Sequence, residues 1–201
     1  MTTPRDLLIV ALDPAADRSV GQGDLSLALA GAELIDLLRA EAIGLDGDRI
    51  VPGLPLGMGD PLLDEAVSAL ARERPYESVE DWLWRRGRDL AAAYLHALEA
   101  AGEGGGRRRG RRLSLRTDRT RLGDTAERGR AAERWTAREP VLAALGAAVG
   151  LREEQAGGTA GLADAVVTVL AAVNDAVVEL EAVRQRRSIE AAAFDNIWRA
   201  P

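Results

Sequence analysis

The chain has 201 residues, enough to bury one sizeable core, and its 47% hydrophobic content includes only 3% aromatic residues. Ala, Leu and Val must therefore fill the interior, which is typical of helical bundles because Ala and Leu lead the helix propensity scale. The absence of Cys excludes disulfides and thiolate metal sites. No apolar run approaches the roughly 20 residues of a membrane span, and residues 1–10 lack a signal-peptide layout, so a cytoplasmic protein is expected.

The net charge of −6 is unevenly distributed along the chain. Residues 107–121 contain eight Arg and one Asp, a local balance of +7, which leaves 18 Arg against 31 acids elsewhere. A basic segment on an acidic body predicts contact with anionic surfaces through one face only. All 26 basic residues are Arg, a bias that suggests a bacterial source, and the planar guanidinium suits phosphate better than an ammonium does.

The first third of the chain predicts two helices and a hairpin. One helix begins at Thr3, with Pro4 at its first position. A longer helix follows from about Asp24, and its apolar stripe recurs at helical spacing. This stripe consists of Leu27, Ala30, Leu34, Leu37 and Leu38. The pair Asp46-Gly47 stands between two short apolar runs, and Asp-Gly is among the strongest hairpin signals.

The middle of the chain carries two capping signals. Asp60 precedes a Pro and an apolar helix, and Ser78 opens a helix with Trp82 and Trp84, both expected in the core. An Ala-rich helix is expected over residues 88–101, ending at a glycine-rich linker. The basic segment then alternates apolar and polar residues at 113–116, which predicts a second hairpin.

Helices are expected over residues 125–137 and 140–151, followed by the longest one over 162–187. This last helix is apolar on nearly every side, which predicts a place at the centre of the bundle. Residues 189–198 are expected to close the chain as a separate short helix. The sequence therefore predicts a single all-α domain over residues 1–201, with a long central apolar helix and one or two small hairpins.

Catalytic patterns are missing from the sequence. His96 is the only histidine and lies among Ala and Leu, which is typical of a helix-surface residue rather than a base. Asp175, Glu179 and Glu181 lack a metal partner, and no nucleophile triad, phosphate loop or dinucleotide fingerprint is present. We therefore expect no enzyme activity, no metal and no cofactor.

Three patches resemble the Golgi phosphoprotein 3 family by their order and spacing. They are LIDLLRAEAIGLDG from Leu34, PLLDEAVSALARERPYESVEDWLWRRG from Pro61 and TDRTRLGD from Thr117. The resemblance implies a non-enzymatic helical adaptor, since eukaryotic members bind phosphatidylinositol 4-phosphate, adhere to Golgi membranes and gather glycosyltransferase tails. It also implies that the hairpin around residues 107–116 is a surface for self-association.

The resemblance further places the family's lipid pocket on this chain. The pocket tryptophan corresponds to Gly21, the arginine on the nearby helix to Ala30, and the arginine pair on the later helix to Arg88 and Ala91. Only Arg88 keeps the residue type that the family uses, so a specific head-group pocket is not expected. A general contact with anionic lipid through the basic hairpin is expected instead.

Our leading hypothesis is a non-enzymatic peripheral membrane adaptor that binds a phosphoinositide resembling phosphatidylinositol 4-phosphate, or another anionic lipid, through a basic face. It would act at the inner face of the membrane, with anionic phospholipid head groups and a protein client as partners and no nucleic acid. Arg85 and Arg86 could join the platform if the end of their helix packs beside the hairpin. The predicted anion-binding residues are Arg88, Arg107, Arg108, Arg109, Arg111 and Arg112.

Three alternatives remain at the level of sequence. A winged-helix DNA-binding regulator would use residues 25–42 or 88–101 for recognition and a hairpin as wing, although the acidic body and the lack of a basic recognition helix disfavour it. A scaffold could dock a partner on residues 189–198. The arginine cluster could also be a solvated loop without a ligand.

Overall fold

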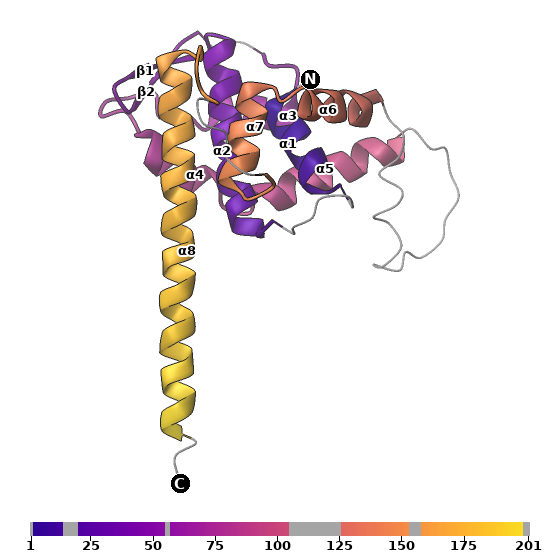
Figure 1. Ribbon diagram of the computed structural model, residues 1–201. Coiled ribbons are helices and arrows are strands. Elements are labelled where there is room, and N and C mark those ends of the chain that lie inside the picture. The colour runs from indigo at the N-terminus through magenta and orange to yellow at the C-terminus, as the bar shows by residue number, and fades with distance from the viewer. Residues whose placement is uncertain (1, 14–19, 55–56, 105–125, 153–157, 199–201) are drawn as a thin grey trace.

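The computed structural model describes residues 2–13, 20–54, 57–104, 126–152 and 158–198, and side chains within these ranges except at 102–104 and 192–198. The described part is all-α apart from one hairpin, which confirms the predicted fold class (Figure 1). Its elements are α1 (Thr3–Ala11), α2 (Gln22–Arg39), β1 (Ile43–Asp46), β2 (Arg49–Pro52), α3 (Pro61–Ser68), α4 (Val79–Arg86), α5 (Leu90–Gly104), α6 (Ala126–Thr136), α7 (Pro140–Ala148) and α8 (Asp164–Trp198).

The central helix of the bundle is α2. Twelve of its 18 residues are buried, and it contacts α1, α3, α4, α5, α7 and α8. Small residues in α2 make these contacts possible, because they let the neighbouring helices approach closely on several sides. They are Ala28, Ala30, Gly31 and Ala32. A helix covered in this way presents no surface to a DNA groove, which argues against α2 as the recognition helix of a winged-helix regulator.

The prediction of α8 as the central apolar helix was wrong. Val169 and Val173 are fully buried on one face, whereas Asp175 and Val178 are exposed on the other, so α8 lies at the edge of the bundle. Every residue from 185 to 191 is exposed, and the C-terminal half of α8 extends beyond the other helices (Figure 1). The prediction of a separate helix at 189–198 was also wrong, because no Gly or Pro interrupts the helix.

The first predicted hairpin is present, but its turn lies one residue further along. Asp46 still pairs with Arg49, so the two loop residues are Gly47 and Asp48. Gly47 has φ 61°, a conformation that glycine adopts without steric cost. The hairpin is fastened to the bundle on the β2 side, where the N–H of Ile50 donates to the carbonyl of Glu77 at 2.9 Å.

Both predicted caps are confirmed. The Asp60 carboxylate accepts from the backbone N–H of Leu62 at 2.9 Å, and the Ser78 hydroxyl accepts from that of Asp81 at 3.0 Å. Of the two tryptophans in α4 only Trp82 is fully buried. The predicted start of a linker at residue 102 was wrong by three residues, because α5 continues to Gly104.

Candidate functional site

The predicted anion-binding residues are only partly within the described structure. Arg107, Arg108, Arg109, Arg111 and Arg112 lie outside the described residues, as do the second predicted hairpin and the TDRTRLGD patch. Arg88 lies between α4 and α5, where its side chain is exposed and makes no hydrogen bond or ion pair with another described residue. Its guanidinium is therefore not held by the described part of the body.

The structure shows where the basic segment is attached. It begins after α5 and ends before α6, and these two helix ends emerge on the same side of the body, opposite α8 in the view of Figure 1. Arg88 precedes the other end of α5. A helix of 15 residues is about 22 Å long, so Arg88 lies roughly this distance from the C-terminal end of α5.

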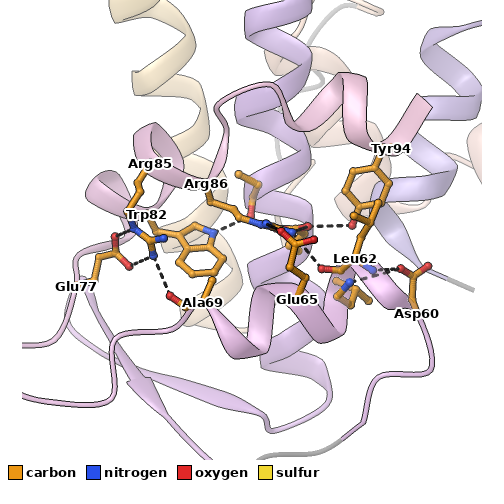
Figure 2. Close-up of polar contacts among 12 residues, drawn as sticks. Asp60, Leu62, Glu65, Ala69, Glu77, Trp82, Arg85, Arg86 and Tyr94 are labelled. Carbon is orange, nitrogen blue, oxygen red and sulfur yellow. Dashed lines mark hydrogen bonds and ion pairs between the residues drawn. The ribbon is translucent and has the colours of Figure 1, made fainter. Parts of the chain in front are cut away.

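Arg85 does not belong to a free basic platform, because its guanidinium is held by the body (Figure 2). Its Nε and Nη2 donate to the Glu77 carboxylate at 2.6 and 2.7 Å, and Nη2 also donates to the carbonyl of Ala69 at 3.2 Å. The guanidinium in addition lies over the Trp82 ring, 5.1 Å from its centre. Three partners thus fix Arg85 at the surface of α4.

Arg86 is held even more firmly, at the centre of the polar cluster shown in Figure 2. It donates to the two oxygens of Glu33 at 2.9 and 3.0 Å, to Glu65 at 2.6 Å and to the carbonyl of Leu62 at 3.1 Å. The Tyr94 hydroxyl also donates to Glu33, at 3.1 Å. The exposed fraction is 10% for the Arg86 side chain and 0% for that of Glu33, so this ion pair lies within the protein.

Burial and pairing act in opposite directions on the charges of this cluster. Burial raises the pKa of Glu33, and the Arg86 guanidinium opposes this rise. Burial would lower the pKa of Arg86, but its hydrogen bonds to Glu33 and the charges of Glu33 and Glu65 raise it. Burial and the neighbouring Glu33 also raise the pKa of Tyr94. Arg86 therefore stays charged, and the cluster is a fixed structural unit rather than a proton-transfer site.

The Glu33–Arg86 cluster was not predicted from the sequence, although one residue indicates it. Glu33 is the one charge in the otherwise uncharged run from 25 to 35, and a buried carboxylate requires a partner from elsewhere in the chain. Nothing in the local sequence identifies that partner as Arg86, which is 53 residues away.

The acids in the family-like patches have structural roles. In LIDLL, Asp36 accepts from the backbone N–H and the hydroxyl of Thr3, each at 2.6 Å. In PLLDEA, Asp64 accepts from the backbone N–H of Met58 at 2.7 Å, and Glu65 pairs with Arg86. These patches therefore fix the N-terminus of α1, the loop before α3 and the end of α4.

Ala30 and Ala91, two of the positions that the resemblance assigns to the family's lipid pocket, are packed in the interior. Ala30 and Ala91 have exposed fractions of 0% and 5%, and the carbonyl of Ala30 accepts from the Trp82 indole N–H at 3.4 Å. Gly21 is exposed, but a side chain there would meet Asp24, whose carboxylate is paired with Arg184 at 2.8 Å. An arginine-lined pocket is not formed at these described positions.

The described residues contain no cluster of three or more His, Cys, Asp or Glu side chains that could hold a metal ion. His96 is exposed on α5, in agreement with its expected surface position, and Asp175, Glu179 and Glu181 are exposed on α8. Among the described helices, none is long and apolar enough to cross a membrane.

Comparison with known proteins agrees with the arrangement of these patches. No curated protein matches the chain at a significant level. The family model described as Golgi phosphoprotein 3 (GPP34) matches residues 4–191, a range that includes the helix with its hairpin, the Glu33–Arg86 cluster and the basic segment. The chain belongs to the Golgi phosphoprotein 3 family.

Proposed function

We propose that this protein is a non-enzymatic peripheral membrane adaptor that binds anionic lipid through its basic segment and gathers a protein client. The observation that carries the proposal is the charge of +7 within residues 107–121 of a chain whose remainder has 31 acids against 18 arginines. Membership of the Golgi phosphoprotein 3 family supports the adaptor class. The lipid-binding residues that we propose are Arg107, Arg108, Arg109, Arg111 and Arg112, with Arg88 as a further candidate.

The mechanism is electrostatic adsorption. Each Arg near an anionic leaflet contributes on the order of 1 kcal/mol, so five arginines would change membrane partitioning by several orders of magnitude. The acidic remainder is repelled by the same surface, which orients the protein with its basic segment toward the membrane. Binding must weaken with salt, because surface charges are screened within about 10 Å at 0.1 M ionic strength.

The pairing of Arg85 and Arg86 supports the assignment of lipid binding to the basic segment. Arg85 and Arg86 are held by carboxylates of the body, so they contribute little charge to an external ligand. The anionic lipid would therefore be met by the basic segment, and the two helix ends that flank it orient that side of the body to the membrane (Figure 1).

The test is co-sedimentation with vesicles of phosphatidylcholine alone, with added phosphatidylserine, or with added phosphatidylinositol 4-phosphate. One variant carries Ser at positions 107, 108 and 109, and a control of equal charge change carries Arg72→Ser, Arg186→Ser and Arg187→Ser, which are exposed arginines elsewhere. A third variant changes all five arginines of the segment to Ser.

We expect the triple variant to lose most binding to both anionic vesicles, the five-fold variant to lose all of it, and the control to keep it. The melting temperature should change little, because surface substitutions usually stay within about 0.5 kcal/mol. Equal loss in the control would show that only net charge matters. A large fall in melting temperature would mean that the arginines pair with the acidic body, and either result would overturn the proposed platform.

A further inference from the structure

The second half of α8 leaves the body of the protein as a single helix (Figure 1). The packing of α8 against the body reaches Leu180 and Arg184, which pairs with Asp24 at 2.8 Å. Every residue from 185 to 191 is exposed. A helix gains most of its stability from the packing of one face, so an extension without such packing indicates that a partner covers it.

Two of the three large apolar side chains that are exposed in the described structure lie on α8. They are Val178, which is 61% exposed, and Ile189, which is 69% exposed. These residues are eleven positions apart, about three full turns, so they point to the same side of the helix. The fully buried Val169 and Val173 face the body from the other side. Val178 and Ile189 therefore mark the outer side of α8.

The outer side of α8 has the spacing of a coiled-coil seam. Steps of four and three residues alternate along it, a pattern that keeps one stripe of a helix turned toward a second helix. Its two alanines allow the second helix to approach closely. All the seam residues are exposed except the half-exposed Ala182, and the others are Ala171, Asp175, Val178, Gln185 and Ile189.

We propose that the outer side of α8 pairs with the same side of α8 in a second copy of this chain, antiparallel, to form a two-fold symmetric dimer. In this register Val178 of each copy faces Ile189 of the other, so both exposed side chains are buried twice. Each body lies on the side of its own α8 that faces away from the seam, so the two bodies do not collide. The pairing uses neither the basic segment nor the proposed lipid contact.

The charges beside the seam identify a second copy as the partner and select the antiparallel orientation. Glu179 lies beside the first half of the seam and Arg186 beside the second, so this flank of α8 is complementary to its own reverse. Both side chains are exposed, and neither forms a hydrogen bond or ion pair with another described residue. In the antiparallel pair Glu179 of each copy meets Arg186 of the other. A parallel pair would instead bring the two Asp175 carboxylates together at the seam.

The experiment is sedimentation velocity of the full-length chain at several concentrations without lipid, so its outcome does not depend on the proposed lipid contact. Val178→Glu and Ile189→Glu place a carboxylate in the seam. Leu54→Glu is the matched control, because Leu54 is the third exposed large apolar residue of the described structure and lies outside α8. Glu179→Arg, Arg186→Glu and the double variant that exchanges the two charges test the orientation.

We expect a dimer of twice the chain mass of 21.4 kDa that dissociates on dilution. Val178→Glu and Ile189→Glu should each weaken it by about a hundredfold, because the contact occurs twice and each loss is worth at least about a factor of ten. Leu54→Glu should leave it unchanged. Each single charge variant should weaken the dimer, and the exchanged double variant should restore it.

Circular dichroism checks that every variant is folded, which is expected because the substituted side chains are exposed. A wild-type chain that stays monomeric up to about 100 μM would overturn the proposal. A dimer that persists in both seam variants would place the interface elsewhere and would overturn it as well. Failure of the double charge variant to recover the dimer would refute the antiparallel pairing.

Discussion

Arg86 in the last turn of α4 is joined to Glu33 in the middle of α2 by two hydrogen bonds of 2.9 and 3.0 Å. The two residues are 53 positions apart, and Glu33 is completely buried. The pair therefore fixes α4 against the central helix from within, where a charge without its partner would be costly.

We predict that Arg86→Ala lowers the free energy of unfolding by about 3–5 kcal/mol, because it leaves Glu33 buried and unpaired. Arg85→Ala is the matched control, since the Arg85 side chain is 47% exposed and its ion pair with Glu77 should contribute at most about 1 kcal/mol. Urea denaturation of both variants measures the difference. Similar losses in the two would contradict the special role of the buried pair.

The double variant Glu33→Leu with Arg86→Leu separates the cost of a lone charge from the value of the pair. Replacing both partners by apolar residues of similar size is often neutral, so this variant should recover much of the stability that Arg86→Ala loses. If it is as unstable as the single variant, the contacts of Arg86 with Glu65 and of Tyr94 with Glu33 carry the effect instead.

Gly31 marks a close approach between α2 and α8. A Cβ at this position would collide with a methyl group of Val173, which is itself fully buried. Gly31→Ala should therefore destabilise the protein by about 1–3 kcal/mol through overpacking. Gly129→Ala on α6 is the control, because a Cβ there meets nothing within 4 Å and alanine should stabilise the helix by about 0.5–1 kcal/mol. Thermal unfolding should shift in opposite directions for the two variants.

Asp60 combines a cap with an ion pair. Its carboxylate accepts from the N–H groups of Leu62 and Leu63 and pairs with Arg5 at 2.5 Å. We predict that Asp60→Ala costs about 2 kcal/mol or more, the sum of a cap worth about 1 kcal/mol and a mostly buried ion pair. Asp60→Asn should lose less, because the amide oxygen still caps α3. Chemical denaturation that ranks the two variants equally would show that the charge alone matters.

The stability of this protein should depend unusually on pH. Burial raises the pKa of Asp6 and of Asp36 above their ordinary value of 3.8. The folded protein thus takes up these protons at a higher pH than the unfolded chain, so the free energy of unfolding should rise as the pH falls from 7 through these raised pKa values. The pKa of Glu139 is lowered, mainly by its hydrogen bond from Leu142 and the charge of Arg134, against the effect of burial. Its contribution is lost only below about pH 4.5.

Urea midpoints at several pH values between 7 and about 4.5 measure this slope. Asp36→Asn removes one of the three buried carboxyl groups whose pKa is raised, which are Asp6, Glu33 and Asp36, and it should flatten the rise. A steady loss of stability over the same interval would show that these carboxyl groups are stabilised as anions, contrary to the effect of burial.

The sequence by itself determined the local features of this protein. Asp60 and Ser78 were recognised as caps, and the helix followed by a hairpin was placed within a residue or two, because each signal acts through neighbours a few positions away. The order of the patches around Leu34 and Pro61 also sufficed to indicate the family, which the match over residues 4–191 shows. The all-α class followed from Ala and Leu content and helical periodicity.

Only the tertiary structure decided which arginines are free and which helix is central. Arg85, Arg86 and Arg88 are near neighbours in sequence, yet the first two are held by carboxylates and the third is exposed, because their partners come from distant segments. The small residues of α2 let it, rather than the longer helix α8, occupy the centre, since close packing of several helices depends on shape as much as on hydrophobicity.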